Sequence, residues 1–391
     1  MTDVMPLVRL STDLVSAGPW IFGRQVADDR DRPDDGALVE VYDGSDRFIG
    51  HGLYNRRSDI RVRLLSRGKK SELRNVRDYL LRTLSAADRL RRKTLKLESV
   101  TDAYRIAHAE GDDLPGLIVD RLGSVLVCEH HALGFWNMRR DVEWALNQLY
   151  PGFEIVHRVP TSAAKAEGFE TNEAPRDVGI VHVTENEVVI PVKPGVGHKT
   201  GYFCDQRDNR LKIAQLALGA DVLDMCTNTG GFALQCKRLG ARSVRAVDLD
   251  EVVLERAKEA AKINRLDIEF LHADGFNVFR SVKAAREKPN LIILDPHKLI
   301  RGRADDEEGI RRYHDWNTLA LEAVRPGGIV ATFSCSGALE LPAFLGILFQ
   351  SARRAGREIR LLETLGAGPD HPQRPDFSRS RYLKGAVLAV D

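Results

Sequence analysis

A cysteine stands between two serines at the end of an apolar run, in "GGIVATFSCSGALE" (residues 327–340). By its residue type, Cys335 could fill a core, bind a metal, join a disulfide or act as a nucleophile. The chain has five cysteines, an odd number without C-x-x-C spacing, which disfavours a disulfide framework and a zinc site. Core packing and nucleophilic chemistry therefore both stay open for Cys335 from the local sequence.

Aspartates end four other apolar segments, and they are Asp224, Asp248, Asp274 and Asp295. From about residue 205 onward, these segments alternate with stretches of helical period, which predicts a parallel, doubly wound sheet. Ligands of such sheets bind outside the carboxyl ends of the strands. A single aspartate there is usually a helix cap or a turn residue, but four in succession together with Cys335 predict a binding site.

The segment "DMCTNTGGF", which includes the first of these aspartates, indicates the kind of ligand. Gly230 and Gly231 allow a close backbone approach, yet neither G-x-G-x-x-G nor G-K-[ST] is present, which disfavours a dinucleotide and phosphoryl transfer. Asp248 follows at about the spacing at which an acidic residue reaches a ribose. We therefore predict S-adenosyl-L-methionine, with Asp224 at its amino-acid end, Asp248 at the ribose and Asp274 at the adenine amino group.

The composition is that of a folded protein, with 43% hydrophobic and 29% charged residues in a chain of 391, which is long enough for two or three domains. A net charge of +2 does not by itself indicate a nucleic-acid partner. The start of the chain lacks the pattern of a signal peptide, and no segment reaches the apolar length of a membrane span. We expect a reduced, soluble, cytoplasmic protein without membrane association.

Residues 1–70 are expected to form a small β domain, because apolar and polar residues alternate on both sides of a turn in 37–55 and again in 60–68. Residues 71–190 are expected to form an α+β middle domain that begins with a helix over 71–96, and residues 191–391 the doubly wound domain. Arginines cluster in 56–67 and 74–93. By default these are solvated faces, but the guanidinium group also suits contacts with RNA.

Motifs along nearly the whole chain, taken in order, resemble those of the ribosomal RNA large-subunit cytosine-5 methyltransferases that join a PUA domain to a class I methyltransferase domain. They are "GPWIFGRQV", "GHGLYNRRSDIRVRLLSR", "GDDLPGLIVDR", "TGYFCDQRDNR", "NTGGF", "VDLD", "ILDP", "RPGGIVATFSCSG" and "RYLKG". The resemblance implies a Rossmann-like methyltransferase fold with a mostly parallel seven-stranded sheet, preceded by a small α+β middle domain and a PUA-like β-barrel. Its expected partners are RNA, ribosomal RNA in particular, and a second copy of the chain in a homodimer.

The same resemblance assigns roles to individual residues. It implies that Gln206, Arg207, Thr229, Gly230 and Gly231 help the three upstream aspartates to hold the cofactor. It also implies that Asp295 faces the target base and that Cys335 is the nucleophile. Addition of a thiolate to carbon 6 of cytosine makes carbon 5 nucleophilic enough to accept a methyl group, and a neighbouring carboxyl can stabilise the charge that develops on the ring.

Two positions depart from the family pattern. The chain reads "DPHKL" where the family has Asp-Pro-Pro-x-Phe, and Asn228 stands where the family has tyrosine. Asn228, Pro296 and His297, with His371 further on, are the candidates for lining the pocket of a flipped base. The departures leave two alternatives open: methylation of another RNA base atom, such as a guanine nitrogen, and an RNA-binding assembly factor that no longer transfers methyl groups.

Overall fold

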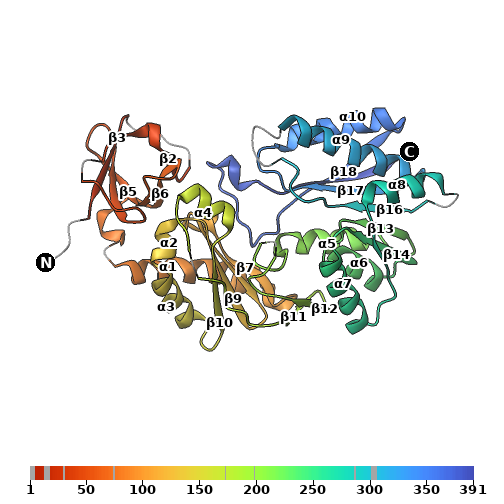
Figure 1. The fold of residues 1–391 in the computed structure, drawn as a ribbon, viewed down its shortest axis with the longest axis horizontal. Coiled ribbons are helices and arrows are strands. Elements are labelled where there is room, and N and C mark those ends of the chain that lie inside the picture. The colour runs from red at the N-terminus through yellow and green to blue at the C-terminus, as the bar shows by residue number, and fades with distance from the viewer. Residues whose placement is uncertain are drawn as a thin grey trace. The chain divides into compact units, whose positions relative to one another are not determined.

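The computed structural model describes residues 5–12, 18–29, 31–73, 75–171, 173–197, 199–285, 288–300 and 306–391 (Figure 1). The chain divides into two compact units. The first comprises Met1–Val181, Lys193–Phe203 and Pro369–Ser380, and the second His182–Val192, Cys204–Gly368 and Arg381–Asp391. The three-domain division at residues 70 and 190 stays a prediction, because the first unit takes in later parts of the chain.

The first unit begins with a six-stranded sheet in the order β2-β6-β5-β4-β1-β3. Its strands are β1 (Leu7–Leu10), β2 (Trp20–Phe22), β3 (Val26–Asp28), β4 (Leu38–Tyr42), β5 (Phe48–Tyr54) and β6 (Ile60–Arg67). The predicted hairpin is present, since β4 and β5 pair antiparallel with Leu38 opposite Leu53. The apolar positions of these strands, such as Val39, Val41 and Val62, are fully buried in one core, as their alternation predicts.

A second, four-stranded sheet in the order β10-β9-β8-β7 completes the first unit with its helices. The elements are α1 (Val76–Arg89), β7 (Ala103–His108), β8 (Leu117–Leu122), β9 (Val125–His130), α2 (Leu133–Asn137), α3 (Arg139–Leu149), β10 (Glu154–Arg158) and α4 (Thr161–Glu167). The Asn75 side chain caps α1 by accepting hydrogen bonds from two backbone amides. Leu80, Leu84 and Ala87 of α1 are buried at the spacing that predicted the helix.

Two arginines of the predicted solvated clusters are buried instead. Arg63 donates to Glu167 at 2.9 Å, although the alternation in β6 predicted its side chain on an outer face. Arg91 has no exposed surface and pairs in bidentate fashion with Asp112, at 2.7 and 2.6 Å. The prediction of a solvated face is therefore wrong for these two residues, and Arg74 lies outside the described residues. Buried guanidinium groups need such partners, because an isolated buried charge is strongly unfavourable.

The segment Pro369–Ser380 joins the first unit through contacts with Arg91 and Arg105. The carbonyl oxygen of Asp370 accepts a hydrogen bond from Arg91 at 2.7 Å, and the Asp370 carboxylate accepts one from the backbone amide of Arg105 at 3.0 Å. Arg105 in turn holds Asp120 with two hydrogen bonds of 2.7 and 2.9 Å. A network of buried charges therefore connects residues that lie far apart in the sequence.

The second unit is built on a seven-stranded sheet in the order β15-β14-β13-β16-β17-β19-β18 (Figure 1). Its strands are β13 (Asp221–Met225), β14 (Ser243–Asp248), β15 (Glu269–His272), β16 (Leu291–Leu294), β17 (Gly328–Ser334), β18 (Ile359–Gly366) and β19 (Lys384–Val390). The first five run parallel, and β19 lies antiparallel between β17 and β18. This confirms the predicted Rossmann-like, mostly parallel sheet.

Helices cover both faces of this sheet. They are α5 (Arg207–Gln215), α6 (Gly231–Arg238), α7 (Glu251–Ile263), α8 (Gly275–Ala284), α9 (Asp306–Ala323) and α10 (Leu341–Ala355), and a hairpin of β11 (Val181–Glu185) and β12 (Val188–Val192) precedes them. One core packs α8, α9 and α10 against the sheet, and a second core packs α5 and α6 against it. Alternate residues of each strand, such as Val222 and Leu223, enter opposite cores, as expected for a doubly wound sheet.

We predict that Asp112→Ala destabilises the first unit by about 3 to 5 kcal/mol, because it leaves the buried Arg91 guanidinium without its carboxylate. The matched control is Asp141→Ala, which removes a half-exposed pair with Arg77 and should change stability by less than about 1 kcal/mol. Native-state hydrogen exchange of amides in β7, β8 and β9 measures both changes. Equal effects of the two substitutions would contradict a stabilising role for the Arg91–Asp112 pair.

Candidate active site

The parallel strands of the second unit place five candidate residues at one edge of the sheet. Asp224 is the penultimate residue of β13, and Asp248 is the last residue of β14. Asp295 directly follows β16, and Cys335 directly follows β17. Asp274 comes two residues after β15, where it is the N-cap of α8. Since neighbouring parallel strands end at the same edge, these side chains belong to one site at the carboxyl ends of the strands.

A tight turn between β13 and α6 shapes the middle of this edge. Gly230 has a φ of +80°, a left-handed conformation that favours glycine. A Cβ atom on Gly231 would lie 2.7 Å from Cδ of Arg210, which is held in place by two hydrogen bonds to the buried Glu185. The backbone amide of Asn228 donates to the Asp248 carboxylate at 2.8 Å, which fixes the turn against β14.

The carboxylate of Asp224 is completely buried beneath this turn. One of its oxygens accepts hydrogen bonds from the Thr227 hydroxyl at 2.5 Å and from the Ala233 backbone amide at 3.1 Å. Its other oxygen is buried and has no hydrogen-bond partner among the described residues. Burial raises the pKa of Asp224 to about 7, against the lowering effect of those two hydrogen bonds. A cationic ligand group would satisfy the unpaired oxygen, and the ammonium of an amino acid is such a group.

The two outer aspartates are more accessible. Asp248 is half-buried and accepts hydrogen bonds from the backbone amides of Asn228 and Asp250. Asp274 is exposed, and one of its oxygens accepts from the backbone amide of Asn277 at 3.1 Å. Both carboxylates are thus oriented by backbone amides at the rim of the site, and Thr229 is buried in the turn between them and Asp224. These donors and acceptors fit a ligand with hydroxyl and amine groups.

Gln206 and Arg207, which the resemblance places at the cofactor, are both buried in the second unit. The Gln206 side chain donates to Asp295 at 2.8 Å and accepts from the Asn209 amide at 2.6 Å, so that it orients Asp295. The Arg207 guanidinium donates to Asp208 at 3.0 Å. The structure therefore connects Gln206 to the carboxylate that follows β16, a connection that the sequence did not indicate.

The two serines beside Cys335 hold the end of β17 and the loop after it in place. Ser334 and Ser336 are fully buried, and both hydroxyl groups hydrogen-bond the Tyr313 hydroxyl, at 2.8 and 2.9 Å. Ser336 also accepts a hydrogen bond from the backbone amide of Ile300 at 3.1 Å, which ties the loop after β16 to the loop after β17. Cys335 lies between these two anchors and is half-buried, whereas Ser334 and Ser336 are fully buried. Its role as a nucleophile stays a prediction.

A second cysteine lies in the same site in a different electrostatic environment. Cys226 is half-buried and directly follows β13. Burial, together with the negative charges of Asp248, Asp295 and Asp224, raises the pKa of the Cys226 thiol well above its ordinary value. A thiol in this position is a poor nucleophile, because the surrounding carboxylates oppose formation of the thiolate.

The pocket candidates separate between the two units. In the second unit, Asn228 is half-buried beside Asp248, Pro296 is buried and His297 is exposed directly after Asp295. His371 belongs to the first unit, where it is buried with Nδ1 3.2 Å from Asp370 and its ring 5.0 Å from that of His108. The role of His371 in the pocket of the base therefore stays a prediction.

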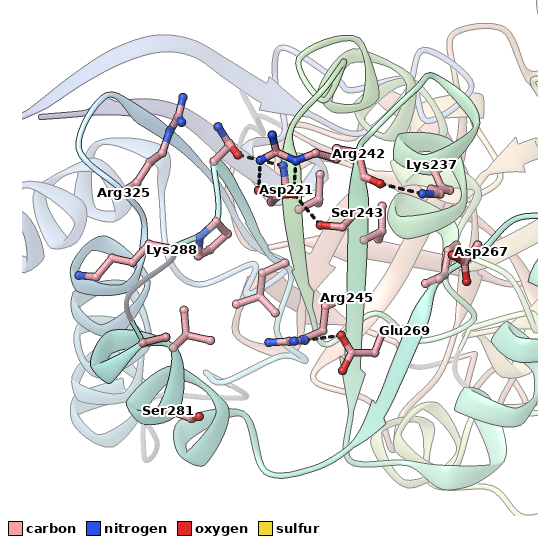
Figure 2. Close-up of a pocket in the computed structure, with 18 of the residues that line it drawn as sticks. Asp221, Lys237, Arg242, Ser243, Arg245, Asp267, Glu269, Ser281, Lys288 and Arg325 are labelled. Atoms are coloured by element: carbon pink, nitrogen blue, oxygen red, sulfur yellow. Dashed lines mark hydrogen bonds and ion pairs between the residues drawn. The ribbon is translucent and has the colours of Figure 1, made fainter.

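A broad groove lies at the opposite end of the same sheet, and none of the candidate site residues is among the described residues that line it (Figure 2). It is lined by residues that begin the strands, including Asp221 of β13, Ser243 of β14 and Glu269 of β15. Figure 2 shows that two of its arginines are paired: Arg242 with Asp221, and Arg245 with Glu269, the latter at 2.7 Å. The described residues that line the groove include no cysteine or histidine, whereas Cys335 and the candidate aspartates lie at the carboxyl ends of the strands.

Comparison with known proteins finds relatives that match along almost the whole chain. Residues 13–67 match a PUA-like domain, and residues 156–386 match an S-adenosylmethionine-dependent methyltransferase. The chain is 35% identical over 96% of both chains to Ribosomal RNA large subunit methyltransferase I of Pseudoalteromonas atlantica. It is 34% identical, again over 96% of both chains, to the protein of the same name from Aeromonas salmonicida.

Solved structures share the fold. A protein from Streptococcus mutans, assigned as a SAM-dependent methyltransferase, superimposes with a TM-score of 0.80 at 19% identity, over 98% of this chain and all of that one. A second solved protein, assigned as a methyltransferase and complexed with S-adenosylhomocysteine, gives a TM-score of 0.79 at 20% identity, over 98% of this chain and 99% of that one. Within the described part of the chain, no helix has the length and apolar character needed to cross a membrane.

We predict a pH dependence of stability that comes from Asp224. The folded chain holds the Asp224 proton more tightly than the unfolded chain, so the stability that this carboxyl contributes is present below pH 3.8 and is lost as the pH rises through about 7. Relative to Asp224→Asn, the wild type should therefore lose about 2 to 3 kcal/mol of unfolding free energy between pH 5 and pH 8. Urea unfolding of both proteins at the two pH values measures the difference.

Asp221→Asn provides the control in the same strand. Hydrogen bonding to Arg242 lowers the pKa of Asp221, so its contribution to stability is lost only in acid and should not change between pH 5 and pH 8. If Asp224→Asn and Asp221→Asn gave the same pH profile as the wild type, Asp224 would not be the buried titrating group described above.

Proposed function

This chain belongs to the S-adenosylmethionine-dependent methyltransferases, and we propose that it methylates carbon 5 of a cytosine in large-subunit ribosomal RNA. The observation that carries the proposal is the position of Cys335, half-buried at a strand end beside the strand that leads to Asp295. The names of the relatives that match along almost the whole chain support ribosomal RNA as the substrate. Such a substrate fits the cytoplasmic location expected from the sequence.

The strand-end residues fit the cofactor of this family. Asp224 would receive the ammonium group on its unpaired buried oxygen, Asp248 the ribose hydroxyls and Asp274 the adenine amino group. The backbone of the turn formed by Thr229, Gly230 and Gly231 would approach the cofactor closely. The buried Gln206 and Arg207 would support this site. When bound, the cofactor supplies an electrophilic methyl group on a sulfonium.

The residues of the chain would activate the base for this methyl group. The Cys335 thiolate adds to carbon 6 of the cytosine, a sulfur–carbon bond forms, and the electron pair of the 5,6 double bond makes carbon 5 nucleophilic. The protonated carboxyl of Asp295 donates a hydrogen bond to ring nitrogen 3 and stabilises the charge that develops on the ring, while Gln206 holds Asp295 in orientation. After methylation a base removes the proton from carbon 5, and the sulfur–carbon bond breaks to restore the aromatic ring and the thiolate.

The departures at Asn228 and His297 bear on the base rather than on the cofactor. Asn228 contacts Asp248 through its backbone amide, so its side chain is not needed for that contact. His297 is exposed and directly follows the buried Pro296, at the position where the base would enter. Two alternatives, methylation of a guanine nitrogen and loss of methyl transfer in an RNA-binding assembly factor, would therefore need no change in the cofactor residues. The test of Cys335 distinguishes both alternatives from the cytosine-5 mechanism.

We predict that Asp248→Ala weakens binding of S-adenosylhomocysteine at least tenfold, because hydrogen bonds from the ribose hydroxyls to a carboxylate contribute about 1.5 to 3 kcal/mol each. Titration calorimetry at fixed pH measures the dissociation constants. Asp250→Asn is the matched control, since Asp250 is exposed and caps α7 through two backbone amides without facing the site. Unchanged binding by Asp248→Ala would contradict the assignment of Asp248 to the ribose hydroxyls. Absence of binding by the wild type would contradict the proposed cofactor site as a whole.

We predict that RNA carrying 5-fluorocytosine at the target position forms a covalent adduct with this protein. Fluorine cannot leave carbon 5 as a cation, so the adduct should survive denaturation after methyl transfer, and Cys335→Ala should lose both adduct and turnover. Cys226→Ala is the control in the same site and should keep both. Mass mapping of ribosomal RNA from a strain without the protein identifies the target. Methylation by Cys335→Ala at a rate near wild type would overturn the cytosine-5 assignment.

A further inference from the structure

A buried lysine lies beside Cys335 on the neighbouring strand. Lys384 is the first residue of β19, and it pairs with Ser334 in the antiparallel ladder between β17 and β19. Cys335 is the next residue after Ser334. Only 4% of the Lys384 surface is exposed, although the rest of this strand is apolar and lysine is seldom buried without an anionic partner.

The hydrogen bonds of Lys384 do not neutralise its charge. Its Nζ donates to the backbone carbonyl of Ser336 at 2.5 Å and to that of Tyr382 at 2.9 Å. Among the residues that the structure describes, no carboxylate lies within ion-pair distance of Nζ. Burial lowers the pKa of Lys384 to about 8, while the charge of Cys335 acts to raise it. The ammonium form therefore predominates at neutral pH, and a thiolate at Cys335 would be an anionic partner for it.

We propose that Lys384 is the fixed positive charge that stabilises the thiolate of Cys335. This inference rests on the proposed function, and Lys384 acts through Cys335 without touching the substrate. The thiol proton leaves to solvent, no bond forms to Lys384, and its ammonium makes the thiolate more favourable than the thiol because opposite charges attract. Its carbonyl partners hold the ammonium against the loop that contains Cys335.

The other charged and titratable groups around this pair come from two further elements. Lys298 and Asp295 lie on the loop after β16, and the Tyr313 hydroxyl of α9 lies within the electrostatic reach of Cys335. Lys298 is exposed, so water screens its charge more than that of the buried Lys384. Cys226 in the same site has carboxylates around it instead of an ammonium. The site thus gives its two half-buried cysteines opposite electrostatic environments.

The test follows the reaction of the full-length protein with iodoacetamide, which alkylates the thiolate with release of iodide. Peptide mass spectrometry reads Cys335 and Cys226 separately as a function of pH. In Lys384→Met, we expect the pH midpoint for Cys335 to rise by about one unit or more, and its rate at pH 7 to fall about tenfold. The slow reaction of Cys226 should stay unchanged, which makes it the internal control for the fold of the site.

Two further variants keep the result interpretable. Lys384→Gln retains an amide donor for the carbonyls of Ser336 and Tyr382 but carries no charge, so it should show the same shift as Lys384→Met. Lys298→Met removes an exposed charge and should shift the midpoint by less. A normal midpoint in Lys384→Gln, or a shift in Lys298→Met as large as in Lys384→Met, would overturn the proposal.

The outcome can be separated from that of the proposed function. If Cys335→Ala abolishes methylation but the pH midpoint of Cys335 alkylation does not depend on Lys384, the cytosine-5 mechanism is supported and the role of Lys384 is contradicted. If the pH midpoint depends on Lys384 but Cys335→Ala still methylates, the interaction between Lys384 and Cys335 is supported and the covalent mechanism is contradicted. In the first case another group must activate the thiol, and in the second the activated thiol has no part in catalysis.

Discussion

The register of the parallel strands is the constraint on which the rest of the second unit depends. Asp224 of β13 is paired with Ala246 of β14 and with Ile293 of β16, and Leu294 is paired with Thr332 of β17. Because side chains alternate between the two faces, a slip of one residue would move each strand's side chains into the core on the opposite face. The buried rows on both faces therefore fix the register, and the register in turn brings the carboxylates and the thiol to one edge.

The sequence allowed the strands, the order of motifs and the strand-end residues to be predicted, because these depend on local periodicity and on the direction of each strand. Lys384, Arg63 and Arg91 could not be placed in this way. Lys384 comes beside Ser334 only because β19 inserts antiparallel between β17 and β18, and this pairing has no local signal. Arg63 and Arg91 looked like surface residues, since their carboxylate partners lie far along the chain. A lone lysine at the start of the apolar run "KGAVLAV" was the one available hint.

The site separates charge along the edge of the sheet. Toward β14, the buried carboxyl of Asp224 and the half-buried Asp248 make an anionic end that suits a cationic ligand. Toward β19, the ammonium of Lys384 makes a cationic end. Asp295 directly follows β16, the strand between these two ends, and Gln206 donates to it from the turn before α5. In the proposed reaction, a positively charged methyl donor would meet the anionic end and an anionic sulfur would meet the cationic end of this edge.

The segment Pro369–Ser380 also sets the order in which the chain can be completed during synthesis. It leaves the second unit after β18, supplies Asp370 to Arg91 and Arg105 in the first unit, and returns to form β19. The N-terminal part of a nascent chain emerges first and folds first where it can. Here the first unit must wait for residues near the far end of the chain before its buried arginines gain all their partners. Its final packing is therefore a late event, coupled to the arrival of the strand that carries Lys384.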